Sequence, residues 1–168
     1  MTFKTGDAVV HPFRGDGIVI SVAERQWHGH EHLYYRIKLL DQPGTILMIP
    51  ISTAKELGLR HAISQSNVSE VWGVLRAVPN VLPNDHKERY QLLEDKLHTG
   101  DAFQIAEVVR DMAWRLQRKG RLTTVGRRRY KEGIRFLAGE IAAVEGIEMV
   151  NAEAQVLARL AECTSYIA

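Results

Sequence analysis

Only one cysteine, Cys163, occurs among the 168 residues, so no disulfide can form within the chain. Such sparse cysteine is typical of proteins from a reducing compartment. Cys163 falls on a helical apolar pattern near the C-terminal end, which favours a small core side chain over a reactive nucleophile. No apolar run approaches the roughly 20 residues needed to cross a bilayer, and the opening stretch MTFKTGDAVV has no signal-peptide core. We therefore expect a cytoplasmic protein with no membrane partner.

Catalytic sequence motifs are absent as well. The chain contains no phosphate loop, no HExxH metal motif and no nucleophile elbow. No pair of carboxylates lies near a histidine or cysteine in a pattern that suggests acid–base catalysis. We therefore expect a protein that is not an enzyme and that uses no cofactor.

Three histidines, His28, His30 and His32, alternate in the stretch WHGHEHL. In one straight strand they would face the same side and could bind a metal ion. Gly29, however, is typical of a hairpin turn, which would break this alternation. We favour a solvated hairpin tip over a metal site.

Positive charge is concentrated in one segment. The whole chain has 22 basic and 20 acidic side chains, but residues 118–135, RKGRLTTVGRRRYKEGIR, contain eight basic residues and a single acid, Glu132. The remainder of the chain is acidic on balance, so the segment produces a local positive field that the net charge conceals. One interpretation is a solvated charge cluster at helix ends. The other is a surface that contacts nucleic-acid phosphates.

The first 50 residues have the pattern of short strands separated by turns that contain glycine and proline. Expected strands cover residues 8–10, 17–23, 33–40 and 45–49. In the third of these, Tyr35, Ile37 and Leu39 alternate with polar residues, which indicates one buried face. We predict a small antiparallel β barrel or sandwich. Such a small sheet leaves edges open. An open edge is either a liability, because it can pair with strands of other chains, or a docking site.

From residue 66 onward the apolar residues recur with helical period. The local signals for helix ends are clear. Helices are expected to begin after Asp85, after Asp101 and at Thr123 or Thr124, and to end at Gly100, Gly120 and Gly146. The last helix is expected to bury Val150, Ala154, Leu157 and Leu160. The fold class is therefore α+β, with a β module over residues 1–55 and an all-α module over residues 56–168.

Trp114 lies about half a turn away from the apolar stripe of its helix, on the same side as Arg110 and Arg118. One interpretation is a second packing face against a neighbouring helix, because aromatic side chains are mostly buried. The other is an aromatic side chain presented beside the basic segment, where it could stack on bases.

Several dispersed motifs are similar to those of one protein family. FKTGDAVVHPFRGDGIVISV, YYRIKLL and the strand that ends at Pro50 resemble the CarD/CdnL family of bacterial transcription regulators. ERYQLLEDKLHTGDAFQIAEVVRDMAWRLQRKG resembles the helical domain of that family, and RFLAGEIA resembles its last long helix. The resemblance covers nearly the whole chain, with order and spacing retained.

This resemblance implies that the two modules have different functions. An N-terminal Tudor-like barrel, of a type also found in the transcription-repair coupling factor, would dock on the β subunit of RNA polymerase. The helical domain would contact promoter DNA at the upstream edge of the transcription bubble, where a family tryptophan wedges into the minor groove. The protein would thereby stabilise the open promoter complex, and we expect it to be a monomer when free.

The resemblance also assigns positions in this chain. The wedge tryptophan corresponds to His86, four residues before Tyr90. The basic residue of the family's docking strand corresponds to Met48, and Arg25 is retained. The expected polymerase contacts are Arg25, Thr45, Ile46, Leu47, Met48, Ile49 and Pro50. The expected DNA contacts, from the resemblance and the basic segment together, are His86, Lys87, Arg89, Trp114, Arg118, Lys119, Arg121, Arg127, Arg128 and Lys131.

Two other functions are compatible with the same residues. One is a polymerase-binding paralogue with weak or no wedge activity, because His86 replaces the tryptophan. The other is a β module that binds a ligand or metal and carries a helical dimerisation domain. Copurification with polymerase, or with a ligand as a stable homodimer, would separate them.

Overall fold

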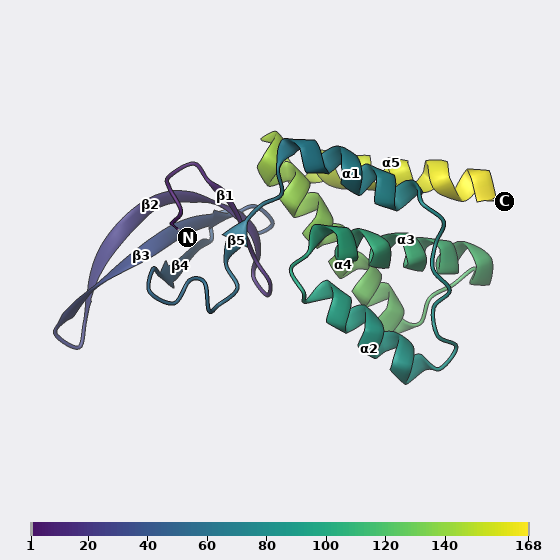
Figure 1. Ribbon diagram of the computed structural model, residues 1–168, viewed down its shortest axis with the longest axis horizontal. Coiled ribbons are helices and arrows are strands. Elements are labelled where there is room, and N and C mark those ends of the chain that lie inside the picture. Colours follow the sequence, from purple (N-terminus) through teal and green to yellow (C-terminus); the bar gives the residue numbers. More distant parts are fainter. Residues whose placement is uncertain (1, 168) are drawn as a thin grey trace.

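The computed structural model describes residues 2–167 and consists of an antiparallel sheet followed by a group of helices (Figure 1). The strands are β1 (Ala8–His11), β2 (Gly15–Trp27), β3 (His30–Leu39), β4 (Ile46–Pro50) and β5 (Arg60–His61). The helices are α1 (Gln65–Arg76), α2 (His86–Leu97), α3 (Ala102–Lys119), α4 (Thr124–Glu145) and α5 (Met149–Ile167). Among the described residues, no helix combines the length and the apolarity needed to span a membrane.

The sheet has the strand order β4-β3-β2-β1-β5, and all of its pairings are antiparallel. Tyr35, Ile37 and Leu39 of β3 are buried, as the alternation predicts. The long β2–β3 hairpin turns at His28 and Gly29, which both have positive φ, as a two-residue hairpin turn requires. The predicted turn at Gly29 is confirmed.

The fold class is confirmed as α+β, but the sheet is open and not a closed barrel. Within residues 2–167, β4 pairs only with β3, and β5 pairs only with β1. Residues 51–58 form turns between the two edge strands, so no strand bridges them. The sheet is therefore not closed, and the open edges that the sequence predicts are present at β4 and β5. The division at residue 55 stays a prediction about folding units.

Local capping signals predict the helix ends well. The Asp85 and Asp101 side chains accept a hydrogen bond from an amide of the first turn of α2 and α3, and Thr123 does the same for α4. Gly120 and Gly146 end α3 and α4 in the left-handed conformation. These residues satisfy main-chain groups that a helix end leaves unpaired, and this explains why the ends can be predicted from the sequence.

The buried face of α5 differs from the prediction. Ala152, Val156 and Leu160 pack into the core, whereas Val150 is 71% exposed and Leu157 is 43% exposed. Ala154 is also exposed. Because α5 carries apolar side chains around most of its circumference, periodicity alone does not select one face. Contacts with α1, α3 and α4 make the selection.

A buried ion pair joins the sheet to the helices. Glu140 of α4 is 1% exposed, and its carboxylate accepts two hydrogen bonds from the Arg60 guanidinium of β5, at 2.7 and 2.9 Å. The same carboxylate accepts the backbone amide of Ile63 at 2.8 Å, and Arg60 also donates to the carbonyl of Gly100. One side chain of α4 therefore fixes the last strand, the segment that follows it and, through Arg60, the α2–α3 connection.

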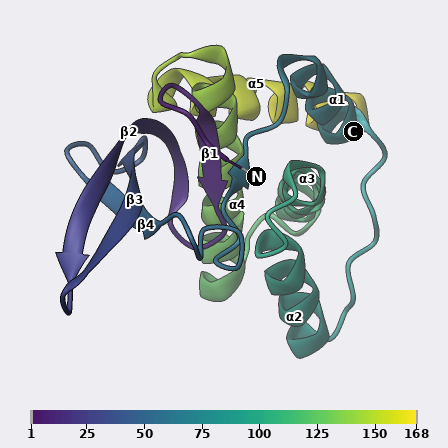
Figure 2. The same cartoon turned by 60° about the vertical axis from the view of Figure 1, so that its left-hand side comes forward.

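Figure 2 shows α4 beside the sheet. The two approach each other closely at Asp16 of β2 and Gly139 of α4. A Cβ atom at residue 139 would overlap the Asp16 carboxylate, so this contact requires glycine. Burial, and then the nearby Glu140 carboxylate, raises the pKa of Asp16 well above its usual value. Beside this contact, Arg135 of α4 pairs with Asp41 at 3.4 Å. Five ionisable side chains, Asp16, Asp41, Arg60, Arg135 and Glu140, therefore lie at the junction of the two modules.

We predict that Glu140→Ala lowers the free energy of unfolding by about 3 kcal/mol or more, because it removes a buried carboxylate and leaves the Arg60 guanidinium and the Ile63 amide without their acceptor. Glu107→Ala is the matched control. Glu107 pairs with Lys96 at 2.5 Å, but both side chains are partly exposed, so its loss should cost less than about 1 kcal/mol. Urea unfolding of both variants measures the difference. Equal effects would contradict the proposed role of the Glu140 pair.

Candidate nucleic-acid interface and docking edge

The end of α3 and the start of α4 present a group of exposed cations, which we call the basic face. Gly120 ends α3 and Thr123 caps α4 three residues later, so the two helix ends lie side by side. In the described part of the chain, no member of the group takes part in an ion pair between side chains. The basic face consists of Arg118, Lys119, Arg121, Arg127, Arg128 and Lys131.

Two arginines of the same segment are held internally. Arg129 is largely buried and binds Glu94 at 2.6 Å and Glu132 at 3.1 Å. Arg135 pairs with Asp41 of the sheet module. The segment 118–135 therefore divides into side chains that hold the fold together and side chains that lie in solvent, and the predicted DNA contacts of this segment are all in solvent.

The start of α2 adds two exposed positions and one buried arginine. His86 is the first residue of α2 and is exposed, with its ring edge-on to Tyr90 at a centroid distance of 6.3 Å. Lys87 is also exposed. Arg89 is only 5% exposed, and it donates to the carbonyl oxygens of Pro83 and Asn84 at 2.8 and 2.9 Å. Arg89 thus fixes the loop before α2, and its predicted DNA contact remains untested.

Trp114 is half-buried, and the Arg118 guanidinium lies 4.5 Å from the centre of its ring. On one side Trp114 borders the small cavity that Leu75, Leu160 and Cys163 also line. The predicted second packing face is therefore present, and the ring is partly covered by a cation. Burial raises the pKa of the half-buried Cys163 thiol, which fits a packing side chain.

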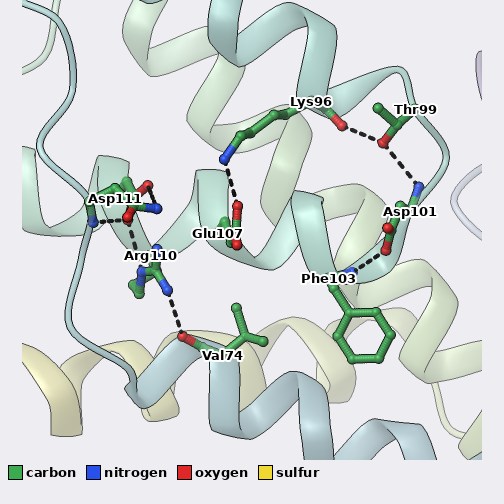
Figure 3. A network of polar contacts seen from close by, with 9 residues as sticks. Val74, Lys96, Thr99, Asp101, Phe103, Glu107, Arg110 and Asp111 are labelled. Atoms are coloured by element: carbon green, nitrogen blue, oxygen red, sulfur yellow. Dashed lines mark hydrogen bonds and ion pairs between the residues drawn. The ribbon is translucent and has the colours of Figure 1, made fainter.

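A buried pair inside α3 supports the α1–α2 loop and was missed from the sequence. Asp111 accepts the Arg110 guanidinium at 2.8 Å, and it accepts the backbone amide of Asn80 at 2.9 Å. Arg110 in turn reaches the carbonyl of Val74 (Figure 3). Two charged residues in the otherwise apolar run VVRDMA were the available signal, because buried charges require partners.

The predicted docking strand lies at the free edge of the sheet. Met48 stands opposite Arg36 of β3, and Arg25 of β2 stands opposite His32 of β3. Because His32 and Arg36 are an even number of residues apart in one strand, Arg25 and Met48 belong to the same face of the sheet. This is the face away from the buried Ile49. Thr45 and Ile46 are exposed, and Leu47, Met48 and Pro50 are half-buried.

Comparison with known proteins defines the class. The family described as CarD-like/TRCF RID domain matches residues 3–63, which contain the whole sheet. The family described as CarD, C-terminal domain, matches residues 70–157, more than half of the chain. The chain belongs to the CarD family of transcription regulators, a class of transcription factors and not of enzymes, whose RID domain interacts with RNA polymerase. The resemblance predicted from the sequence motifs is confirmed.

One relative extends over almost the same length. A Bacillus subtilis (strain 168) protein named "Putative transcription factor YdeB" is 26% identical over 145 residues. The alignment covers 86% of this chain and 94% of that protein. The similarity therefore includes both the sheet and the helices.

We predict that replacing Arg127 and Arg128 together by alanine weakens binding to promoter DNA in the presence of polymerase on all sequences alike. Each lost phosphate contact should reduce the log–log salt slope by about 0.9. Salt titrations of wild type and variant measure this difference. Arg14→Ala/Arg76→Ala removes the same charge from exposed positions outside the basic face and should leave the slope unchanged.

Proposed function

We propose that this protein docks on the β subunit of RNA polymerase through the edge strand β4 and contacts promoter DNA at the upstream edge of the bubble through the basic face. It thereby stabilises the open promoter complex in the cytoplasm, and it is a monomer when free. The observation that carries the proposal is the placement of an open sheet edge and a basic helical face on two modules that Glu140 holds together. Family membership supports the polymerase interaction.

The free edge of β4 is chemically suited to docking. An edge strand presents unpaired amide and carbonyl groups that a strand of another protein can complete. Main-chain pairing would supply affinity, and the side chains beside it would supply specificity. Met48 and the exposed Arg25 share one sheet face, so a single partner surface can contact both.

The basic face is suited to DNA phosphates and to weak binding. Its exposed cations would contact phosphates, which are the same in every DNA sequence, and would therefore not select particular bases. A single small module neutralises few phosphates, and free protein should therefore bind DNA weakly. Docking on polymerase raises the effective concentration of the module at the promoter, where weak contacts become significant.

His86 is the better candidate for the minor-groove position. It is exposed at the first position of α2, beside the exposed Lys87, whereas Trp114 is half-buried and stacked under Arg118. An imidazole offers less apolar surface than an indole to offset the cost of unstacking a base step. We therefore propose a weaker wedge than that of relatives with tryptophan at this position. A paralogue without wedge activity is the competing outcome.

For docking, we predict that the double change Met48→Glu/Arg25→Glu weakens binding to the β subunit by about 2 kcal/mol or more, because a carboxylate becomes desolvated in the contact. Val150→Glu/Arg76→Glu places the same groups on exposed helical positions and should bind as wild type does. Pull-down and calorimetry with the full chain measure the difference. Unaltered binding by the strand variant, with its fold intact, would remove β4 from the interface.

For the wedge, we predict that His86→Trp lengthens the lifetime of heparin-challenged open complexes by about tenfold, equivalent to about 1.4 kcal/mol of added stabilisation. His86→Ala should shorten the lifetime, and Lys55→Ala, an exposed change in the sheet module, should not alter it. Identical lifetimes for wild type, His86→Ala and His86→Trp would show that His86 takes no part.

A further inference from the structure

A hollow of about 600 Å³ lies between α2, the end of α3 and the start of α4. Its size is within the range of small-molecule binding sites, which measure about 300 to 1,000 Å³. It opens beside the basic face but draws on other side chains as well. The hollow is lined by Arg89, Tyr90, Met112, Arg115, Lys119 and Arg121, among others.

Four cations line this hollow, and no acidic residue does. Among the described residues, none of Arg89, Arg115, Lys119 and Arg121 is in an ion pair. The Arg89 guanidinium donates to main-chain carbonyls and lies 5.3 Å from the centre of the Tyr90 ring, and neither contact neutralises its charge. Burial, and then the Arg89 charge, lowers the pKa of Arg115. The fold therefore holds two guanidinium groups close enough to repel each other without an acid between them.

The remaining lining is polar at one side and apolar at the base. Tyr90 and Thr123 share a hydrogen bond between their hydroxyl groups, and Thr124 lies beside them. Met112 and Leu122 are buried and form apolar surface. Converging cations fit phosphate oxygens, and an apolar floor fits the flat face of a base or sugar.

We propose that this hollow binds the polyphosphate group of a nucleoside di- or triphosphate. Such a group concentrates about three or four negative charges in one place, which matches a hollow lined by Arg115, Lys119 and Arg121 with the largely buried Arg89 in its wall. Duplex DNA instead spreads its charges along a rod, one per about 1.7 Å of axis, and would lie across the hollow without filling it. The inference does not rest on polymerase docking, because the hollow is formed by one module of the free protein.

Methionine-methyl NMR of the full chain tests the proposal. Met112 lines the hollow, whereas Met48 lies in β4 and Met149 at the start of α5, so the latter two signals serve as internal controls. Titration with adenosine triphosphate should shift the Met112 methyl signal to saturation and leave the other two in place. Inorganic pyrophosphate should shift the same signal, because the phosphate group supplies the main contacts. A duplex of about 15 base pairs should not.

Matched charge variants separate a site from general attraction. Arg115→Gln removes a cation of the hollow, and Arg128→Gln removes one from the basic face outside it. Arg115→Gln should weaken binding of adenosine triphosphate about tenfold, as loss of a charge-assisted hydrogen bond does, and Arg128→Gln should weaken it less than about twofold. The proposal would be overturned if both variants weakened binding of adenosine triphosphate equally. It would also be overturned if the Met112 methyl signal did not shift, or shifted with duplex DNA alone. Unchanged Met48 and Met149 signals verify that each variant is folded.

Discussion

The buried carboxylate of Glu140 is the contact on which the arrangement of the protein depends. The sheet has a small apolar core of its own, and its contacts with α4 fix its position relative to the helices. The Arg60 guanidinium crosses from β5 to Glu140 and also reaches the Gly100 carbonyl, so three separate parts of the chain meet at one ion pair. Such a pair fixes the relative orientation of the two side chains as well as attracting them, because its two parallel hydrogen bonds set the angle between the guanidinium and the carboxylate. The close contact of Asp16 with Gly139 then leaves little room for the sheet to move along the helix.

This arrangement makes α4 the element that connects the sheet to the basic face. Its 22 residues extend about 33 Å, at 1.5 Å per residue. The first half carries Arg127, Arg128 and Lys131 into solvent, and the second half holds the sheet through Arg135 and Glu140. A partner that adds a strand to the free edge of β4 would thus set the direction of the basic face. These two roles of α4 explain why residues 118–135 combine exposed cations with arginines that pair with acids.

Local signals could be predicted from the sequence, and long-range contacts could not. Caps such as Asp85 and Gly120 act within one helical turn, so neighbouring residues suffice to identify them. The choice between a barrel and an open sheet depended on residues 51–58, which form turns without a periodic pattern. Arg89 looked like a free cation because only the folded loop brings the Pro83 and Asn84 carbonyls to it. Arg60 and Glu140 are 80 residues apart in the chain, and a single sequence does not reveal which distant residues pair in the fold. The exposure of Arg128 and Lys131 was predictable, since it follows from the helical period.

The central claim is that a docked sheet delivers the basic face to upstream promoter DNA. Site-specific photo-crosslinking tests it directly, with a photoreactive residue in place of Arg128 at the start of α4 or of the exposed Val150 beyond its other end. We expect crosslinks from position 128 to DNA just upstream of the bubble, only when polymerase is present, and none from position 150. Crosslinks from both positions alike, or from position 128 without polymerase at the same yield, would contradict it.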